Sequence, residues 1–310
     1  MREAHDREEL LIEVRDIRRK GLFSGFPHAD LKRGWYKDSS KKDNGYAWTC
    51  HHDTVHLNDE DIHVKSFKIL GYGLITLTRP IAEFFFNESF VSFEGPQDSI
   101  DRENQVYVEH AGDFHTLESR QDYVRDNGQP VVKGVLLTKH LEDTQDTLDL
   151  ILGCVERGDR TGAIDYVTMA CDLLRKMHAS DVVWGNAWLG NTFMHDGEMY
   201  GYDFGSKPNP NKSQAWLKGK DLLTLCLSGI SHTGEAPSEV VPAVLDAYQP
   251  QPDVRRELRH DLQQDCYRSG AALFWHEMLR PYELVFNAIA YEGLWTPKVT
   301  RTRKELLKRL

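Results

Sequence analysis

Hydrophobic and polar positions follow different patterns in the two halves of the chain. From Val64 to Phe93, short β-branched and aromatic runs such as SFKILGYGLITLTRP are broken by Gly and Pro, which is typical of antiparallel strands. After Glu142, apolar residues recur every three or four positions, most clearly over 161–178, and this spacing predicts helices. We therefore expect a β-rich first part and a helical second part.

The remaining pattern completes this picture. Two short apolar runs, 187–194 and 199–202, flank Asp196-Gly197, which is the strongest hairpin signal in the chain. Residues 33–63 are polar and are expected to be irregular. The other predicted elements are a buried strand at 130–139 and helices at 1–22, 98–110, 143–156, 216–230, 237–248 and, with a break, 252–292.

Composition narrows the class of protein. The 310 residues are 40% hydrophobic and 28% charged, which indicates an ordinary soluble globular chain. The sequence has no apolar run long enough for a membrane span, and its charged start lacks the features of a signal peptide, so we expect a cytoplasmic protein. A net charge of -10 argues against nucleic acid as a partner. The five scattered cysteines include no CxxC pair, which argues against a disulfide framework.

One cluster of metal-binding residue types, Cys50-His51-His52-Asp53 with His56, precedes the strand-like region. Cys and His are zinc ligands, and His52 and His56 would share a face of a helix. No matching second half of a zinc motif follows, so free histidines in a polar loop are the simpler interpretation.

The most informative segment is LRKMHASDVVWGNAWLGNTFMHDGEMYGYDFG, from Leu174 to Gly205. It resembles the catalytic core of the protein-kinase-like superfamily, which includes aminoglycoside and lipopolysaccharide kinases. In that family a helix ends in Leu-His, a loop carries His-Gly-Asp or His-Arg-Asp, an Asn follows the Asp by five residues, and Asp-Phe-Gly follows a hairpin. Here Met177-His178 matches the helix end and Asp203-Phe204-Gly205 matches the final motif.

The resemblance implies an ATP and Mg²⁺ site. Phosphoryl transfer needs oxygen ligands for Mg²⁺ and a carboxylate that accepts the proton of the attacking hydroxyl. Asn191 and Asp203 stand at the positions of the two metal ligands, and the hairpin between them would bring them together.

The position of the general base holds Asn186, and Trp184 replaces the family's His. An amide cannot accept a proton at neutral pH, so phosphotransfer would fall by roughly 10²–10⁴-fold. A natural inactive kinase and an engineered Asp→Asn change both explain this residue. A second register takes Asp181 as the base and Asn186 as the metal ligand, since they are also five residues apart, but it separates Asn186 further from Asp203.

The first half of the chain fits the family less well. Gly71 and Gly73 could open a glycine-rich phosphate loop, and Ser92 would then replace the phosphate-binding Lys. Glu103, on the following helix, would be the partner of that missing Lys. A competing register takes Lys65 as the phosphate-binding Lys and requires a long insertion before Glu103.

Two further positions follow from the resemblance. Thr138-Lys139-His140 would be the hinge between lobes, where backbone groups of Thr138 and His140 meet an adenine. Asp221 resembles the acid that braces the catalytic loop from a helix of the large lobe, although an acid at a helix start also suits the helix dipole.

Together these observations predict an α+β, bilobal, protein-kinase-like fold. Residues 1–60 would form an extension, 61–140 the β-rich lobe and 141–310 the helical lobe. The leading hypothesis is a nucleotide-binding pseudokinase or base-inactivated kinase. The alternatives are an active kinase for a protein or small-molecule hydroxyl, and an interaction module that binds no nucleotide.

Overall fold

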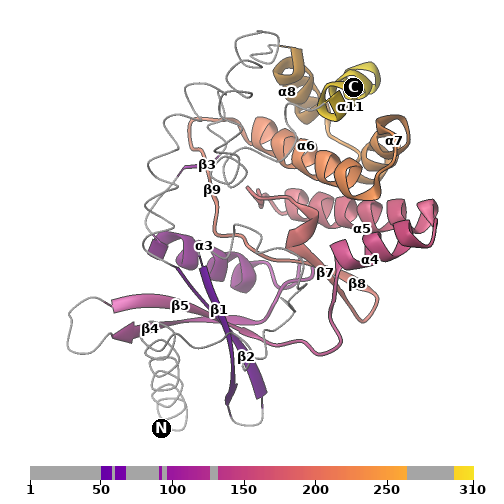
Figure 1. The fold of residues 1–310 in the computed structure, drawn as a ribbon. Helices are drawn as coiled ribbons and strands as arrows, with labels where there is room; N and C mark the ends of the chain where they lie inside the picture. The colour runs from indigo at the N-terminus through magenta and orange to yellow at the C-terminus, as the bar shows by residue number, and fades with distance from the viewer. Residues whose placement is uncertain (1–49, 58–59, 68–90, 93–95, 126–131, 264–296) are drawn as a thin grey trace, which may run out of the picture.

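The structure, a computed structural model, has mixed α and β content and is of the α+β type (Figure 1). It describes residues 50–57, 60–67, 91–92, 96–125, 132–263 and 297–310. In Figure 1 the largest sheet lies at the bottom, with α3 directly above it and the remaining helices stacked towards the top. The β-rich first part and the helical second part are therefore as predicted.

The largest sheet is antiparallel, with strand order β1-β2-β5-β4. Its strands are β1 (Cys50–Leu57), β2 (Glu60–Phe67), β4 (Ser119–Arg125) and β5 (Val132–Lys139). The strand predicted at 130–139 is β5. The prediction of irregular structure at 33–63 is wrong for β1 and the start of β2, because pairing in full register overrides their polar composition. The sheet also begins at Cys50, inside the segment that the sequence assigned to an extension.

Because residues 50–57 form a strand, the helical face predicted for His52 and His56 does not exist. Among the residues that the structure describes, no group of three or more His, Cys, Asp or Glu side chains could hold a metal ion.

Helix α3 (Pro96–Glu109) packs on the sheet through β4 and β5 and corresponds to the helix predicted at 98–110. Its inward face carries Ile100, Glu103 and Tyr107, all buried and spaced by three or four residues. This spacing turns one polar side chain, Glu103, towards the interior together with its apolar neighbours.

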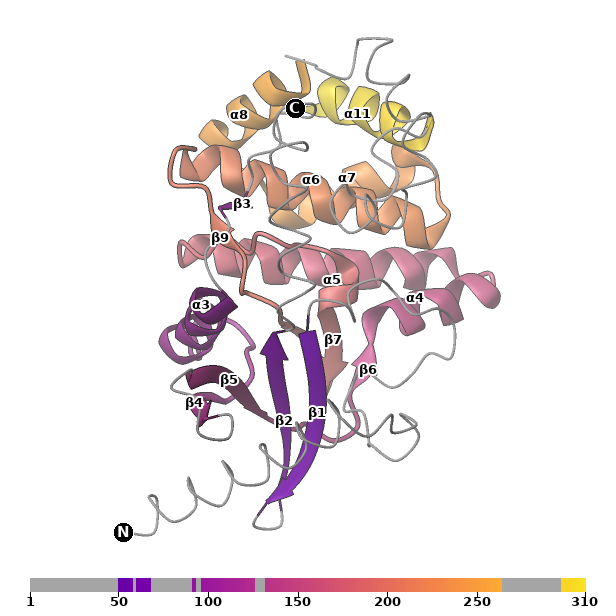
Figure 2. The same cartoon turned by 60° about the vertical axis from the view of Figure 1, so that its left-hand side comes forward.

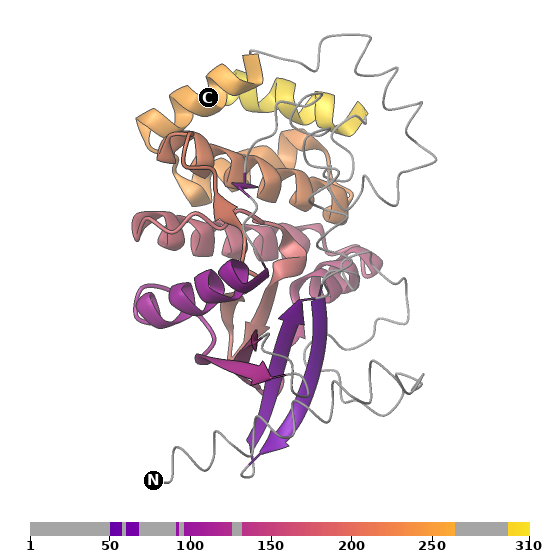
Figure 3. The ribbon, with the colours of Figure 1, turned by 90° about the vertical axis from the view of Figure 1, so that its left-hand side faces the viewer.

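The helical part confirms the helices predicted at 143–156, 161–178, 216–230 and 237–248, within a few residues at each end, and the start of the one predicted at 252–292, whose residues 264–292 lie outside the described residues. Side-chain caps fix several helix starts: Asp146, Asp159 and Ser213 each accept a backbone N–H of the first turn. Figures 2 and 3 show α5 lying between α3 on one side and α6 and α7 on the other. The helices are α4 (Thr147–Glu156), α5 (Arg160–Ala179), α6 (Gln214–Thr233), α7 (Pro237–Tyr248), α8 (Pro252–Gln263) and α11 (Pro297–Arg309).

The predicted hairpin is present between α5 and α6. Strands β7 (Thr192–His195) and β8 (Glu198–Gly201) pair across Asp196-Gly197, and both turn residues have positive φ, 51° and 80°. That is the backbone of the turn that Asp-Gly favours. A 3₁₀ turn, Leu189–Asn191, precedes the hairpin. The two-residue strand β6 (Gln145–Asp146) pairs with β7, the first strand of the hairpin. The hairpin thus brings Asn191, just before its first strand, close to Asp203, just after its second strand.

The two-residue strand β3 (Val91–Ser92) pairs with β9 (Lys207–Pro208), outside the largest sheet. The prediction that Ser92 replaces the phosphate-binding Lys does not agree with this pairing. Gly71, Gly73 and the helix predicted at 1–22 lie outside the described residues. None of the helices within the described ranges is long and apolar enough to cross a bilayer.

Candidate nucleotide site

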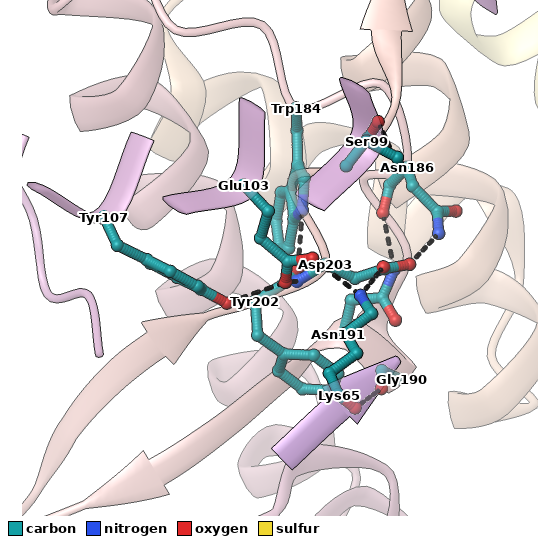
Figure 4. Close-up of polar contacts among 11 residues, drawn as sticks. Lys65, Ser99, Glu103, Tyr107, Trp184, Asn186, Gly190, Asn191, Tyr202 and Asp203 are labelled. Carbon is teal, nitrogen blue, oxygen red and sulfur yellow. Dashed lines mark hydrogen bonds and ion pairs between the residues drawn. The ribbon is translucent and has the colours of Figure 1, made fainter. Parts of the chain in front are cut away.

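A buried lysine joins the sheet to the segment that follows the hairpin. Lys65 Nζ on β2 lies 2.7 Å from Glu103 Oε2 on α3 and 2.6 Å from Asp203 Oδ1 (Figure 4). The side chains of Lys65 and Glu103 are 7% and 2% exposed, and that of Asp203 is 33% exposed. The prediction that Glu103 lacks a lysine partner is wrong, and the competing register, with Lys65, describes the contacts correctly.

Asp203 is held at both carboxylate oxygens. Oδ1 accepts from Lys65, Oδ2 accepts from Asn186 Nδ2 at 2.8 Å, and the backbone N–H of Asp203 donates to Glu103 Oε1 at 3.1 Å. Burial acts to raise the pKa of Asp203, but the charge and hydrogen bond of Lys65 and the hydrogen bond of Asn186 outweigh it, so the pKa lies below its ordinary value. Asp203 is therefore a carboxylate at neutral pH.

Glu103 is the most deeply enclosed member of this group. Its Oε1 accepts from the Tyr107 hydroxyl at 3.0 Å as well as from the backbone of Asp203. Burial raises the pKa of Glu103, and the neighbouring Lys65 charge opposes that rise. Tyr107 was not singled out in the sequence, although Ser99, Glu103 and Tyr107 stand four residues apart and so share one face of α3.

The two asparagines of the predicted motif lie next to Asp203. Asn191 Nδ2 donates to the backbone carbonyl of Asn186 at 2.9 Å, while the side chain of Asn186 reaches Asp203. Each amide uses its nitrogen in these contacts, which leaves both side-chain oxygens as acceptors. The predicted juxtaposition of Asn186, Asn191 and Asp203 is visible in Figure 4.

Asp181, the alternative base, lies in a different setting. It follows the end of α5 with φ of 57°, its side chain is 85% exposed, and it pairs with Lys218 Nζ at 2.8 Å. The hydrogen bond and charge of Lys218 hold the pKa of Asp181 below its ordinary value. A carboxyl with a depressed pKa is a poor proton acceptor near neutral pH.

Asp221 on α6 fixes the loop that carries Asn186. Its Oδ2 accepts the backbone N–H of Trp184 at 2.8 Å, and its Oδ1 accepts that of Gly185 at 3.0 Å. Asp221 is fully buried. The bracing contact predicted for this residue is therefore present, and it defines the path of the backbone immediately before Asn186.

Aromatic packing holds the segment after Asp203. The ring of Phe204, fully buried, stacks on Trp184 at 5.6 Å between centroids and meets Tyr107 edge-on at 5.5 Å. Trp184 Nε1 also donates to the carbonyl of Tyr202 at 2.9 Å. Trp184 therefore contributes a hydrogen bond as well as apolar contact to this segment.

Gly205 completes this segment. The Ser99 hydroxyl donates to the Gly205 carbonyl at 2.7 Å, and a Cβ added at Gly205 would lie 2.3 Å from Ser99 Oγ. A side chain at this position would therefore displace the Ser99 hydroxyl from the Gly205 carbonyl.

The predicted hinge lies beside Lys65 on the sheet. Lys65 pairs with Leu136 and His63 with Thr138, so the side chains of His63 and Thr138 occupy the same face of the sheet as Lys65. Thr138 is 4% exposed. Burial, then Lys65 and His140, lower the pKa of His63 to about 3, so its ring is neutral. The backbone N–H of His140 donates to the carbonyl of Asp61, so that amide is already engaged.

The donor set suits Mg²⁺ in its usual protein setting. Magnesium is commonly held by one or two carboxylates, with water and substrate phosphates completing the octahedron. Here one carboxylate, Asp203, accepts from the Asn186 amide nitrogen, and the Asn191 amide nitrogen donates to the backbone carbonyl of Asn186, so both side-chain oxygens remain available as ligands. These three residues fit a weak, oxygen-ligated ion that a phosphate group would help to hold.

The chain resembles known proteins distantly and in structure alone. No protein-family model matches the sequence, and no curated protein matches it. Among solved structures, 12 chains match, including WaaP in complex with acyl carrier protein. That structure is 15% identical, with a TM-score of 0.43 over 76% of this chain and 85% of that chain.

Proposed function

We propose that this protein has a protein-kinase-like fold and a nucleotide site, and that its phosphotransfer to hydroxyl acceptors is impaired. The observation that carries the proposal is the contact of Lys65 with both Glu103 and Asp203, together with the Asn186 amide on Asp203. In protein kinases a strand lysine pairs with a helix glutamate, and the Asp of Asp-Phe-Gly binds Mg²⁺. The three charged residues of this chain lie on corresponding elements.

The charges support a phosphate ligand. A lysine that is almost completely buried retains its charge only beside compensating anions, and here two carboxylates compensate it. The group carries one positive and two negative formal charges, so an added phosphate would require a cation. Mg²⁺ held by Asp203 and the amide oxygens would supply that charge and orient the phosphates.

The amide side chain of Asn186 supports the proposal that phosphotransfer is impaired. Its amide donates to Asp203, so its nitrogen is occupied, and its oxygen cannot take up a proton at neutral pH. Loss of a general base typically costs 10²–10⁴-fold in rate. Asp181 is a weak substitute because it is exposed and paired with Lys218.

Nucleotide binding is tested by thermal unfolding with millimolar ATP, with and without Mg²⁺. We expect ATP with Mg²⁺ to raise the melting temperature, and we expect Lys65→Met to abolish the rise. Lys304→Met, at an exposed position of α11, is the control and should retain it. Absence of any stabilisation in the unmodified protein would reject the nucleotide site and favour an interaction module.

Phosphotransfer is tested separately with labelled ATP, by following phosphate release and labelling of the chain itself. We expect Asn186→Asp to increase the rate by 10²-fold or more. The control is Asn211→Asp, which adds the same charge at an exposed position after β9. A high rate in the unmodified protein would contradict the impairment. A silent Asn186→Asp variant that still binds ATP would indicate that more than the base is missing.

A further inference from the structure

A second group of buried polar side chains joins α7, α5 and α6. The Tyr248 hydroxyl, at the end of α7, is 2.5 Å from His178 Nδ1, and His178 Nε2 is 3.1 Å from Asp221 Oδ2. The three residues are 4%, 5% and 0% exposed, and they come from α7, α5 and α6. Among the described residues, neither Tyr248 nor the ring of His178 forms a hydrogen bond with Lys65, Glu103 or Asp203.

The positions of the hydrogens shared by Tyr248, His178 and Asp221 follow from which atoms can donate and which can only accept. Burial lowers the pKa of His178 against the opposing effect of Asp221, so the ring is neutral at pH 7 and carries one N–H. A carboxylate only accepts, so that hydrogen lies on Nε2 and points to Asp221. Nδ1 is then an acceptor, and Tyr248 must donate its hydroxyl hydrogen to it.

We propose that Tyr248 is a positioning residue for the nucleotide site, acting through His178 and Asp221. Its hydroxyl satisfies Nδ1 and so stabilises the imidazole tautomer that donates to Asp221. Asp221 in turn holds the backbone N–H groups of Trp184 and Gly185, the two residues before Asn186. The end of α7 thereby sets the place from which the Asn186 amide reaches Asp203.

The His178 ring packs against Tyr248, and its backbone is anchored separately. The Tyr248 and His178 rings meet edge-to-face at 5.4 Å, and Lys218 Nζ donates to the backbone carbonyl of His178 at 2.7 Å. With the backbone anchored and one ring edge against Tyr248, the other ring edge is directed at Asp221. Loss of the Tyr248 hydroxyl removes only the proton donor and leaves this packing intact.

The tautomer is measured directly by nuclear magnetic resonance of the labelled imidazole at pH 7. We expect His178 to be the Nε2–H tautomer in the unmodified protein. An Nδ1–H tautomer would overturn the proposal, because Tyr248 would then accept rather than donate.

The positioning role is measured by hydrogen exchange of the Trp184 and Gly185 amides in Tyr248→Phe. An unsatisfied buried acceptor is expected to speed their exchange about tenfold relative to the Ile151 amide in α4. Tyr166→Phe, on α5 and outside the chain of contacts, should change neither amide. Equal acceleration of all three amides would mean general destabilisation and would overturn the proposal. Adding Tyr248→Phe to His178→Gln should have no further effect, and an additive effect would also contradict it.

The link to the site rests on the proposed function and has its own readout. We expect Tyr248→Phe to weaken ATP binding several-fold, and Tyr166→Phe to leave it unchanged. If the unmodified protein binds no ATP, the proposed function fails, while the tautomer and exchange measurements still decide whether Tyr248 positions the loop. ATP affinity unchanged in Tyr248→Phe would overturn the connection to the site.

Discussion

Replacing Lys65 by Met should reveal how strongly the two carboxylates depend on it. Methionine has a similar length without the charge, so Glu103 at 2% exposure loses its counterion inside the protein. Removing one partner of a buried ion pair costs about 3–5 kcal/mol. Asp203 is one-third exposed and is partly solvated, so the lower end applies. We expect the free energy of unfolding to fall by about 3 kcal/mol at pH 7.

The loss of unfolding free energy in Lys65→Met should increase with pH. The pKa of Glu103 is already raised above its unfolded value of 4.5, and removing Lys65 takes away the largest effect that lowers it. A carboxyl with a raised pKa binds its proton more tightly in the folded state. Stability therefore falls as the pH rises from 4.5 through the folded pKa, and Lys65→Met should be closer to the unmodified protein at pH 5 than at pH 8.

Urea unfolding followed by circular dichroism at pH 5, 7 and 8 measures both effects. Lys304→Met is the matched control and should lie within about 0.5 kcal/mol of the unmodified protein. Adding Glu103→Gln to Lys65→Met removes the stranded carboxylate and should recover at least half of the loss. A Lys65→Met variant as stable as the unmodified protein at pH 8 would refute the reasoning, since Glu103 would then not need its cation.

Three further predictions concern packing and capping. Burial raises the pKa of Asp146 to about 6, so the free energy of unfolding should fall as the pH rises from 4 to 6. The Asp146→Asn side chain can still accept a hydrogen bond at the start of α4, so this variant should flatten that part of the stability curve. An unchanged curve would contradict this. Phe204→Ala should cost about 3–5 kcal/mol in urea unfolding, and a loss under 1 kcal/mol would mean that its aromatic contacts are unimportant. Gly205→Ala should lower the free energy of unfolding by about 1–3 kcal/mol, because the added methyl group collides with Ser99. The control, Gly112→Ala, has open space around it and should be neutral. Equal effects of the two substitutions would contradict the collision.

The helical part and the hairpin could be predicted from the sequence because their signals are local. Apolar spacing locates α5 and α7, and Asp196-Gly197 has few alternatives to a hairpin turn. The order of motifs then placed Asn186, Asn191 and Asp203 together correctly.

The lysine could not be assigned in the same way. Lys65 and Glu103 are separated by 38 positions, and no periodicity reveals which strand lies opposite a helix face. The polar strand β1, with its CHHDTVH run, shows no apolar alternation, so its membership of the sheet depends on pairing with β2. Strand β4, SRQDYVR, escaped prediction for the same reason. Tertiary pairing, rather than local preference, decides both.

The contact between Lys65 and Asp203 spans 138 positions of the chain. Contacts of such high sequence separation form late in folding, because the entropy cost of closing a long loop precedes the favourable energy of the contact. We therefore expect substitutions at this ion pair to accelerate unfolding while leaving the refolding rate nearly unchanged, which stopped-flow measurements over a range of urea concentrations would reveal. The same delay means that this ion pair would form after the local structure of the helices and the hairpin.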